Sequence, residues 1–388
     1  MSGRRGHGEG SIYYRQDREC WCAMVDLGYQ DGKRKRKSIF GKTRKEVAEK
    51  LKVVLRDQQQ GLLVAAERQT VEQFLTRWLA EVVEGKTRPR THQSYKDIAR
   101  LHIIPTLGKL QLSKVTPEDV QRLMNRKLAA GLSPRSVQYI RAVLRMALAQ
   151  ALKWGSVARN VATLVDPPKA ESAPVTVLSP DQARTFLNAA RGDRYEALYR
   201  VAVSLGLRRG EVLGLRWQHV DLERGVLRVA ASLQKLPGKA PTLVAPKTKN
   251  SRRALPLPAA LISALQAHRA RQVEEQRCAG TRWQEYGLVF PTSIGTPINP
   301  PNLVRAFHAL LERAELPHMR FHDLRHSCAT LLAEQHVPER IAMEILGHSD
   351  IRVTQNIYTH VFDHAKRQAS DAMDRLFGDG PVVENPDV

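Results

Sequence analysis

The sequence has few of the residues and patterns that stabilise secreted proteins or span membranes. Only four cysteines occur in 388 residues. Cys20 and Cys22 alone are close together, and one C-x-C pair indicates neither a disulfide framework nor a metal site. No apolar run reaches the roughly 18–20 residues of a membrane-spanning helix, and the start, MSGRRGHGEGSIYYR, lacks the apolar stretch of a secretory signal. We therefore expect reduced, structural cysteines and a cytoplasmic protein.

Acidic and aromatic residues are also scarce. Asp and Glu number 39 against 61 Lys and Arg, a formal net charge of +22, and aromatics make up only 6%. The cores must therefore depend on Leu, Ala and Val. A basic surplus of this size favours a polyanionic partner, with nucleic acid first, although a basic protein that is merely soluble is the alternative. A length of 388 residues favours two or three domains.

The first 62 residues predict a small β-sheet followed by a helix. Residues 11–15, 21–27 and 36–40 are rich in strand formers, and Thr43 with Glu46 predicts a capping box that opens a helix running to about Gln60. A basic run lies on the turn and third strand: Lys33, Arg34, Lys35, Arg36 and Lys37. Such a run is usually a solvated face, but a short sheet can also enter a DNA groove. We predict an accessory DNA-binding domain over residues 1–62.

From residue 68 to 165 the apolar spacing becomes helical. Thr116 and Ser133 each precede a proline and predict helix starts, and basic side chains fall on the outer faces. We expect a compact helical bundle that binds DNA phosphates. Residues 166–178 contain three prolines and predict a linker. Ser179 then begins a domain over 179–370 with short strands at 226–232, 243–247 and 253–257, and a tail follows over 371–388.

Each motif in that last domain is ambiguous when taken alone. Arg208 and Glu211 are three residues apart and would share a helix face, as an ordinary surface ion pair does. His322 and His326 are four apart, but no acidic or cysteine ligand at matching spacing indicates a metal site, and no cofactor motif is present. Leu346-Gly347-His348 predicts a helix end, and Tyr358 could be a packed core residue.

Taken together, the motifs resemble those of the tyrosine recombinase (phage integrase) family. The matching elements, in order, are GLRxxE at 206–211, KT at 247–248, HDLRH at 322–326, LGH at 346–348 and a tyrosine ten residues on. The resemblance covers about residues 175–365, and the preceding sheet and bundle are similar to the family's arm-type and core-type DNA-binding domains. The implied fold is multidomain and mainly α: a three-stranded sheet plus helix, an all-helical SAM-like bundle and an α+β catalytic domain.

The resemblance also implies a role for each motif residue. Arg208 and Arg325 would clamp the non-bridging oxygens of the scissile phosphate, which suits the planar, always charged guanidinium. His348 would add a third donor, and Tyr358 would attack to leave a 3′-phosphotyrosyl link. His322 is the candidate base for the phenolic proton. Lys247, with Lys249 as runner-up, is the candidate acid for the leaving 5′-oxygen, and Glu211 would orient Arg208 or His348.

The implied function is site-specific recombination that integrates or excises a mobile element or phage genome. The implied partners are double-stranded DNA at attachment-type sites, three further copies of the chain in a homotetramer on DNA, and directionality or DNA-bending accessory proteins, in a bacterial host at the nucleoid. The runner-up is DNA relaxation of the type IB topoisomerase kind. A DNA-binding regulator with a decayed site is a third reading, disfavoured because all five elements are intact.

Overall fold

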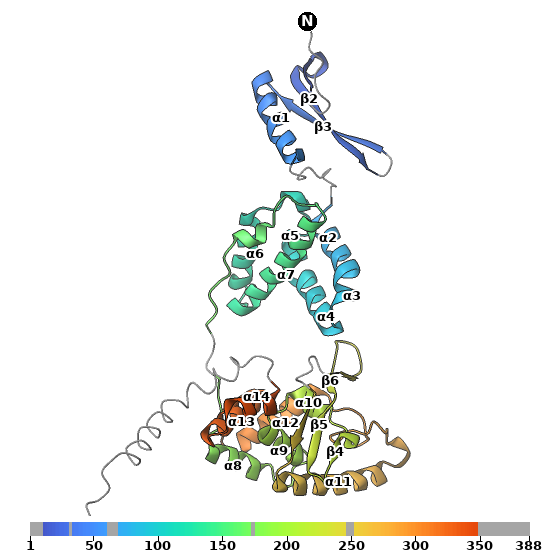
Figure 1. The fold of residues 1–388 in the computed structure, drawn as a ribbon, viewed down its shortest axis with the longest axis vertical. Helices are drawn as coiled ribbons and strands as arrows, with labels where there is room; N and C mark the ends of the chain where they lie inside the picture. Colours follow the sequence, from blue (N-terminus) through green and yellow to red (C-terminus); the bar gives the residue numbers. More distant parts are fainter. Residues whose placement is uncertain (1–10, 31–32, 60–68, 172–174, 246–251, 348–388) are drawn as a thin grey trace, which may run out of the picture. The chain divides into compact units, whose positions relative to one another are not determined.

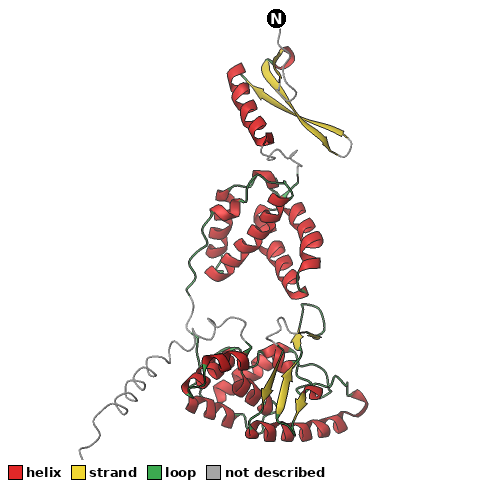
Figure 2. Ribbon diagram, viewed as in Figure 1, coloured by secondary structure: helices red, strands yellow, loops and turns green. Residues whose placement is uncertain are grey.

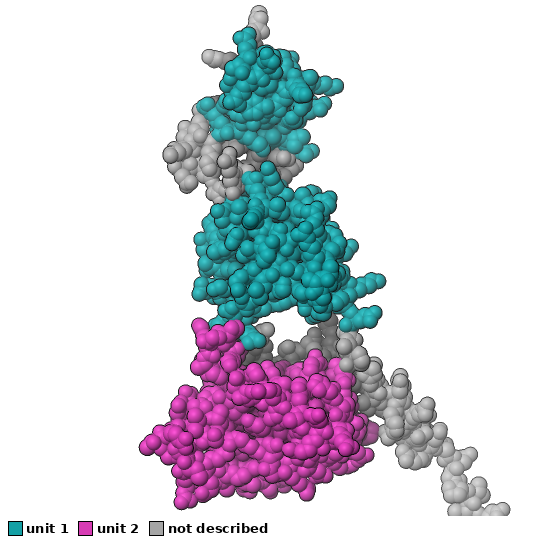
Figure 3. Space-filling model, turned by 180° about the vertical axis from the view of Figure 1, so that it is seen from behind, with its two compact units in different colours: residues 1–172 teal, residues 173–388 magenta. Residues whose placement is uncertain are grey.

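The computed structural model describes residues 11–30, 33–59, 69–171, 175–245 and 252–347. The chain divides into two compact units, residues 1–172 and 173–388 (Figure 3). Helices dominate both, with strands in the N-terminal sheet and on part of the second unit (Figure 2). The expected fold class is therefore confirmed. In the part of the chain that is described, no helix combines the length and apolar character needed to cross a bilayer.

The N-terminal sheet region (residues 11–59) is an antiparallel sheet packed against one helix (Figure 1). Its strands are β1 (Ser11–Arg15), β2 (Cys20–Gln30) and β3 (Lys33–Gly41), in that order, and α1 (Arg44–Gln59) follows. The side chains of Ala23, Val25, Ile39, Val47 and Leu51 form the core between sheet and helix. The amide of Glu46 donates to Thr43 Oγ1 at 3.2 Å, so the predicted cap is present.

The helical region (residues 69–171) contains four long helical runs. The first two combine α2 (Val71–Trp78), η2 (Leu79–Val83) and α3 (Glu84–Lys86), then α4 (Pro89–Ile98), η3 (Ala99–Ile103) and α5 (Ile104–Leu107). The other two are α6 (Pro117–Ala129) and α7 (Pro134–Lys153). Thr116 and Ser133 cap α6 and α7 as predicted, because a hydroxyl N-cap followed by proline is a local signal.

The segments η2 and η3 are π-helical turns inside otherwise α-helical runs, and the sequence did not predict them. A π turn accommodates one extra residue, and the apolar spacing explains where each occurs. Leu79 and Val83 in η2, and Ala99 and Ile103 in η3, are all buried in the core of the helical region. The wider turn therefore keeps the apolar stripe facing inward on both sides of it.

The C-terminal unit, described over residues 175–347, places helices around two small sheets. Its helices are α8 (Pro180–Ala189), α9 (Glu196–Leu205), α10 (Arg209–Leu213), α11 (Ala259–Ala279), α12 (Pro300–Arg313), α13 (Asp323–Glu334) and α14 (Glu339–Leu346). One sheet has the order β4 (Val220–Asp221), β5 (Val226–Val229), β8 (Arg253–Pro256), and β6 (Ser232–Gln234) pairs with β7 (Thr242–Val244). Across both units, short 3-10 turns occur at 16–18, 112–114, 161–164, 217–219 and 280–282.

The expected strand over 226–232 was wrong in one respect. The chain forms two strands there, β5 and β6, which belong to different sheets, with Ala230 and Ala231 between them. β5 pairs with β8, whereas β6 pairs with β7 to form a separate ribbon. Propensity alone could not show this division, since the choice of partner strand is a tertiary effect.

The central helix of the C-terminal unit is α9, and it fixes the segment that follows it. Its side chains are buried along most of its length, and Tyr199 packs edge-on against Phe186 with 5.4 Å between ring centroids. Phe307 of α12 completes this aromatic cluster, 5.8 Å from Phe186. Because α9 is enclosed by packed neighbours, the residues directly after it have little freedom to move.

Candidate active site

The site is built where α9 ends, at Gly206. This residue adopts the left-handed conformation with φ 58°, which glycine tolerates best. A Cβ atom here would lie 2.4 Å from Leu346 Cδ2 and 3.1 Å from Cys328 Sγ. Only a residue without a side chain therefore lets the ends of α9 and α14 meet against α13 at this point.

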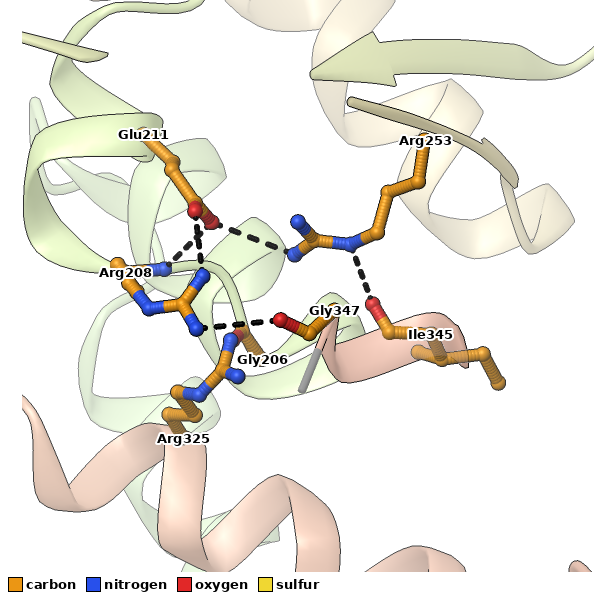
Figure 4. A network of polar contacts seen from close by, with 7 residues as sticks. All are labelled: Gly206, Arg208, Glu211, Arg253, Arg325, Ile345 and Gly347. Atoms are coloured by element: carbon orange, nitrogen blue, oxygen red, sulfur yellow. Dashed lines mark hydrogen bonds and ion pairs between the residues drawn. The ribbon is translucent and has the colours of Figure 1, made fainter. Parts of the chain in front are cut away.

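Arg208 follows two residues later and is held by Glu211. It is the extended N-cap of α10, with φ −65° and ψ 147°, so the expectation that both residues share a helix face was wrong. The two residues are in contact because the Glu211 side chain caps the start of α10. Glu211 Oε2 accepts a hydrogen bond from the Arg208 amide at 3.1 Å, and Oε1 accepts one from Arg208 Nη1 at 2.7 Å (Figure 4). Arg208 Nη2 also donates to the carbonyl oxygen of Gly347 at 3.2 Å.

Arg325 comes from the first turn of α13 and is almost completely enclosed, with 4% of its surface exposed. Its Nη1 donates to the carbonyl oxygen of Gly206 at 2.8 Å. Its Nη2 is buried and has no hydrogen-bond partner among the residues that the structure describes. Burial, followed by the charge of Arg208, lowers the pKa of Arg325 to about 9. The guanidinium is still charged at pH 7, with donor capacity left over.

His322 and His326 lie beside these arginines, in perpendicular orientation with 5.3 Å between ring centroids. Burial of its ring, followed by the charges of His326 and Arg325, lowers the pKa of His322 to about 4. The residue nevertheless has an exposed face, where water screens these charges. A His322 imidazole that is neutral at pH 7 can accept a proton. The described residues hold no group of three or more metal-ligating side chains.

Arg253, at the start of β8, belongs to the same cluster, and the sequence reasoning missed it. Its side chain is only 8% exposed. Its Nε donates to the carbonyl oxygen of Ile345 at 2.6 Å, and its Nη2 donates to Glu211 Oε2 at 3.3 Å (Figure 4). The signal was present in the strand pattern: Arg253 alternates with Leu255 and Leu257, which are buried, so an arginine occupies the core-facing side of the strand.

Glu211 is the carboxylate that the two arginines share. Its burial alone would raise its pKa, but the charge of Arg253 and the hydrogen bond and charge of Arg208 outweigh burial and hold the pKa below its ordinary value. Glu211 is therefore ionised at neutral pH. Its negative charge is offset on both sides, which makes it a fixed support for Arg208.

The structure therefore brings together four of the predicted site residues: Arg208, Glu211, His322 and Arg325. Lys247, its alternative Lys249, His348 and Tyr358 lie outside the described residues. The chain on either side is described, up to Ala245 and Gly347 and again from residue 252. The predicted basic run, Lys33 to Lys37, lies on β3 in the other unit, where the side chains of Arg36 and Lys37 are exposed.

Chemically, the described cluster can bind an oxyanion and accept a proton. Two guanidinium groups lie close enough for Arg208 to lower the pKa of Arg325, and a buried N–H of Arg325 lacks an acceptor among the described residues. An anion placed between them would supply that acceptor and offset the repulsion. The neutral imidazole of His322 lies close enough to both arginines for their charges to lower its pKa.

Two family models match the chain. The model described as the phage integrase family matches residues 176–365, and the phage integrase N-terminal SAM-like domain matches residues 70–128. A tyrosine recombinase XerC-like protein of Caldanaerobacter subterraneus subsp. tengcongensis is 33% identical over 384 residues, covering 94% of this chain and 98% of that protein. An integrase of Streptomyces ambofaciens is 34% identical over 396 residues, covering 98% of this chain and all (100%) of that protein.

Solved structures share the fold. The Tn1549 transposon integrase in complex with a circular intermediate DNA superposes with a TM-score of 0.67 at 22% identity, covering 79% of this chain and 99% of that one. A lambda integrase tetramer bound to a Holliday junction gives a TM-score of 0.56 at 17% identity, covering 87% of this chain and 95% of that one.

Proposed function

Because the chain belongs to the phage integrase family of tyrosine recombinases, we propose that the cluster around Arg208 and Arg325 binds the scissile phosphate of DNA. The chain is a tyrosine-type site-specific recombinase, an enzyme that cleaves and religates DNA. The individual roles of its site residues are our proposal.

The observation that carries the proposal is the Nη2 donor of Arg325, which has no acceptor among the described residues. A buried guanidinium N–H without an acceptor is unfavourable, and a second guanidinium beside it adds repulsion. A phosphate between Arg208 and Arg325 would relieve both, and charge that develops on its oxygens during displacement would meet donors already in place. His348 would be a third donor to the same oxygens.

The remaining roles concern the nucleophile and two protons. The phenolic oxygen of Tyr358 attacks phosphorus and the bond from phosphorus to the 5′-oxygen breaks, leaving a 3′-phosphotyrosyl link and a free 5′-hydroxyl. His322 accepts the phenolic proton, because its imidazole is neutral at pH 7 and has a free lone pair. Lys247, or Lys249 in its place, protonates the leaving oxygen. One phosphoester replaces another, so religation needs no ATP.

We also propose a domain division and an assembly. Residues 1–62 would bind arm-type DNA, 68–165 core-type DNA and 179–370 would hold the catalytic domain, with 166–178 as linker and 371–388 as tail. Arg36 and Lys37 are exposed on β3 and suit DNA contact. The lambda integrase tetramer on a Holliday junction supports a homotetramer of this chain on attachment-type DNA. Directionality or DNA-bending proteins would assist it at the bacterial nucleoid, in the cytoplasm.

Capture of the covalent intermediate tests the function. The full-length chain is mixed with a library of randomised, nicked duplexes in which the short strand beyond the cleavage point diffuses away, and protein–DNA adducts are isolated and sequenced. The wild-type chain should yield adducts on one recurring sequence, and Tyr358→Phe should yield none. No wild-type adduct on any duplex would contradict the proposal. Strand exchange between two selected duplexes supports recombination, whereas supercoil relaxation without exchange would favour the topoisomerase-like alternative.

A further inference from the structure

Arg253 connects three parts of the C-terminal unit that are far apart in sequence. From β8 it donates to Glu211 of α10, which holds Arg208, and to the carbonyl oxygen of Ile345 in the last turn of α14. Arg208 itself donates to the carbonyl oxygen of Gly347, directly after α14. Two arginines and one carboxylate therefore tie the end of α14 to the start of α10 (Figure 4).

The contacts of Arg253 fix the orientation of Arg208 through one oxygen atom. Glu211 Oε2 accepts from Arg253 Nη2 at 3.3 Å and also from the Arg208 amide at 3.1 Å, while Oε1 accepts from Arg208 Nη1 at 2.7 Å. If Arg253 were absent, the carboxylate would keep both contacts to Arg208 but lose the one that anchors it to β8. It could then rotate, and the Arg208 guanidinium would rotate with it.

The end of α14 is held in the same way. The last carbonyl groups of a helix carry partial negative charge and have no partner within the helix, so cations there are favourable. Arg253 and Arg208 each bind one of them, Ile345 O at 2.6 Å and Gly347 O at 3.2 Å. The same two contacts therefore fix the end of α14 as far as Gly347.

Folding alone does not call for an arginine at this position. Arg253 shares the core-facing side of β8 with Leu255, where an apolar side chain would pack without the cost of desolvating a charge. A comparable contact elsewhere in the unit is much more exposed: Arg194 binds Glu275 and the carbonyl oxygen of Pro291, with 33% and 30% of the two charged side chains exposed. The Arg253–Glu211 pair is 8% and 5% exposed.

We propose that Arg253 is a positioning residue for phosphate activation. It holds Glu211, and through it Arg208, against the end of α14, so that the two guanidinium groups face the same phosphate. This inference rests on the proposed function, because it assumes that Arg208 binds the scissile phosphate.

The test measures single-turnover formation of the covalent adduct on the nicked duplex selected by adduct capture. Two versions are used, one with the normal scissile phosphate and one with a methylphosphonate, in which an uncharged methyl group replaces one non-bridging oxygen. Of the two separated methylphosphonate diastereomers, the one on which Arg208→Ala costs least is chosen. On that substrate the position of Arg208 matters little, whereas general damage to the fold affects both substrates equally.

Arg253→Met should slow adduct formation on the phosphate about 30- to 100-fold, because a misplacement of about 1 Å costs rate on this scale. On the methylphosphonate the loss should shrink to less than about threefold, as for Arg208→Ala, and DNA affinity should change little, since Arg253 itself does not contact phosphate in this account. The matched control Arg194→Met also removes an arginine that binds a glutamate and a carbonyl group, and it should leave both rates within about threefold of wild type.

Arg253→Lys is a second variant that tests the same proposal if Arg253→Met does not fold. A lysine keeps the charge near Glu211 but cannot bridge the carboxylate and the Ile345 carbonyl as a planar guanidinium does. It should lose about tenfold on the phosphate, with the same relief on the methylphosphonate.

Equal losses on both substrates, or losses no larger than those of Arg194→Met, would overturn the proposal and leave Arg253 as a folding residue. That result is distinguishable from failure of the proposed function, in which the wild-type chain itself would form no adduct on either substrate.

Discussion

The helical region and the C-terminal unit differ in how deeply their charged side chains are buried. In residues 69–171 the one buried polar side chain among those described is Asn160. The described part of the C-terminal unit buries five polar or charged residues: Glu211, His268, Asp323, Arg325 and Ser327. Arginines on an exposed surface stay hydrated. A site that must hold them in one geometry has to bury them, and it then needs carboxylates and carbonyl groups to offset the cost.

The largest effect is expected where a buried charge is removed from the site. Arg325→Met should slow adduct formation about 1,000-fold, since a fixed donor to developing negative charge is lost. Stability should change by less than about 1 kcal/mol or increase, because an apolar side chain replaces a buried charge whose Nη2 has no acceptor in the described part of the chain. Single-turnover cleavage and thermal unfolding of the same preparation check both. Cleavage within tenfold of wild type would remove Arg325 from the mechanism.

Two glycines with left-handed backbone offer a matched test of packing in the two regions. Gly206→Ala should destabilise the C-terminal unit by about 2–5 kcal/mol, from backbone strain plus the clash with Leu346. Gly131→Ala in the helical region should cost only about 1–2 kcal/mol, since a Cβ there meets nothing within 4 Å. Hydrogen exchange measured by mass spectrometry in urea reports each region separately. Equal costs would show that backbone strain alone determines the effect.

Acid should weaken the C-terminal unit through His322 and His326. Their pKa values are lowered in the folded chain, His322 to about 4, so the unfolded chain binds protons more tightly. Stability should be flat above about pH 6.5 and fall as pH drops toward 5, by no more than about 1.4 kcal/mol per pH unit for one histidine, and less where water screens the exposed ring. Melting temperatures between pH 7 and 5 check this. His322→Asn should melt with a shallower pH dependence, and an unchanged dependence would contradict the assignment.

The smallest effect is expected from an exposed arginine of the helical region. Arg145→Met, on α7, should weaken DNA binding by less than about tenfold and reduce the dependence of log affinity on log salt by about one unit, as the loss of a single phosphate contact would. Adduct formation at saturating protein should be unchanged. Filter binding at several salt concentrations, followed by cleavage at saturation, provides the measurement. A slower saturated cleavage would mean that Arg145 does more than hold DNA.

Local signals in the sequence predicted local structure well. The caps at Thr43, Thr116 and Ser133 are confirmed because each depends on a few adjacent residues. The helix end at Gly347 is confirmed for the same reason. Tertiary choices were not predictable: the division of 226–232 between two sheets depends on partner strands that lie elsewhere in the chain.

At the candidate active site, too, motif residues could be predicted from the sequence but their tertiary contacts could not. Motif order identified Arg208, Glu211, His322 and Arg325, and the structure places them together. The contact between Arg208 and Glu211 was expected on a helix face but is made through an extended N-cap. Arg253 was missed because its partners Glu211 and Ile345 are 42 and 92 residues away. The roles of Lys247, His348 and Tyr358 stay predictions from the motif.

The π turns at 79–83 and 99–103 make two places in the helical region tolerant of a change in chain length. Each turn accommodates a residue that a regular α-helix would not need, and the helix on either side keeps its buried face. Deleting one residue inside either turn would convert it to an ordinary α-helical turn without rotating the flanking side chains. A one-residue gap between homologous proteins at these positions is therefore compatible with an unchanged bundle, whereas the same gap in α6 or α7 would turn apolar side chains toward water.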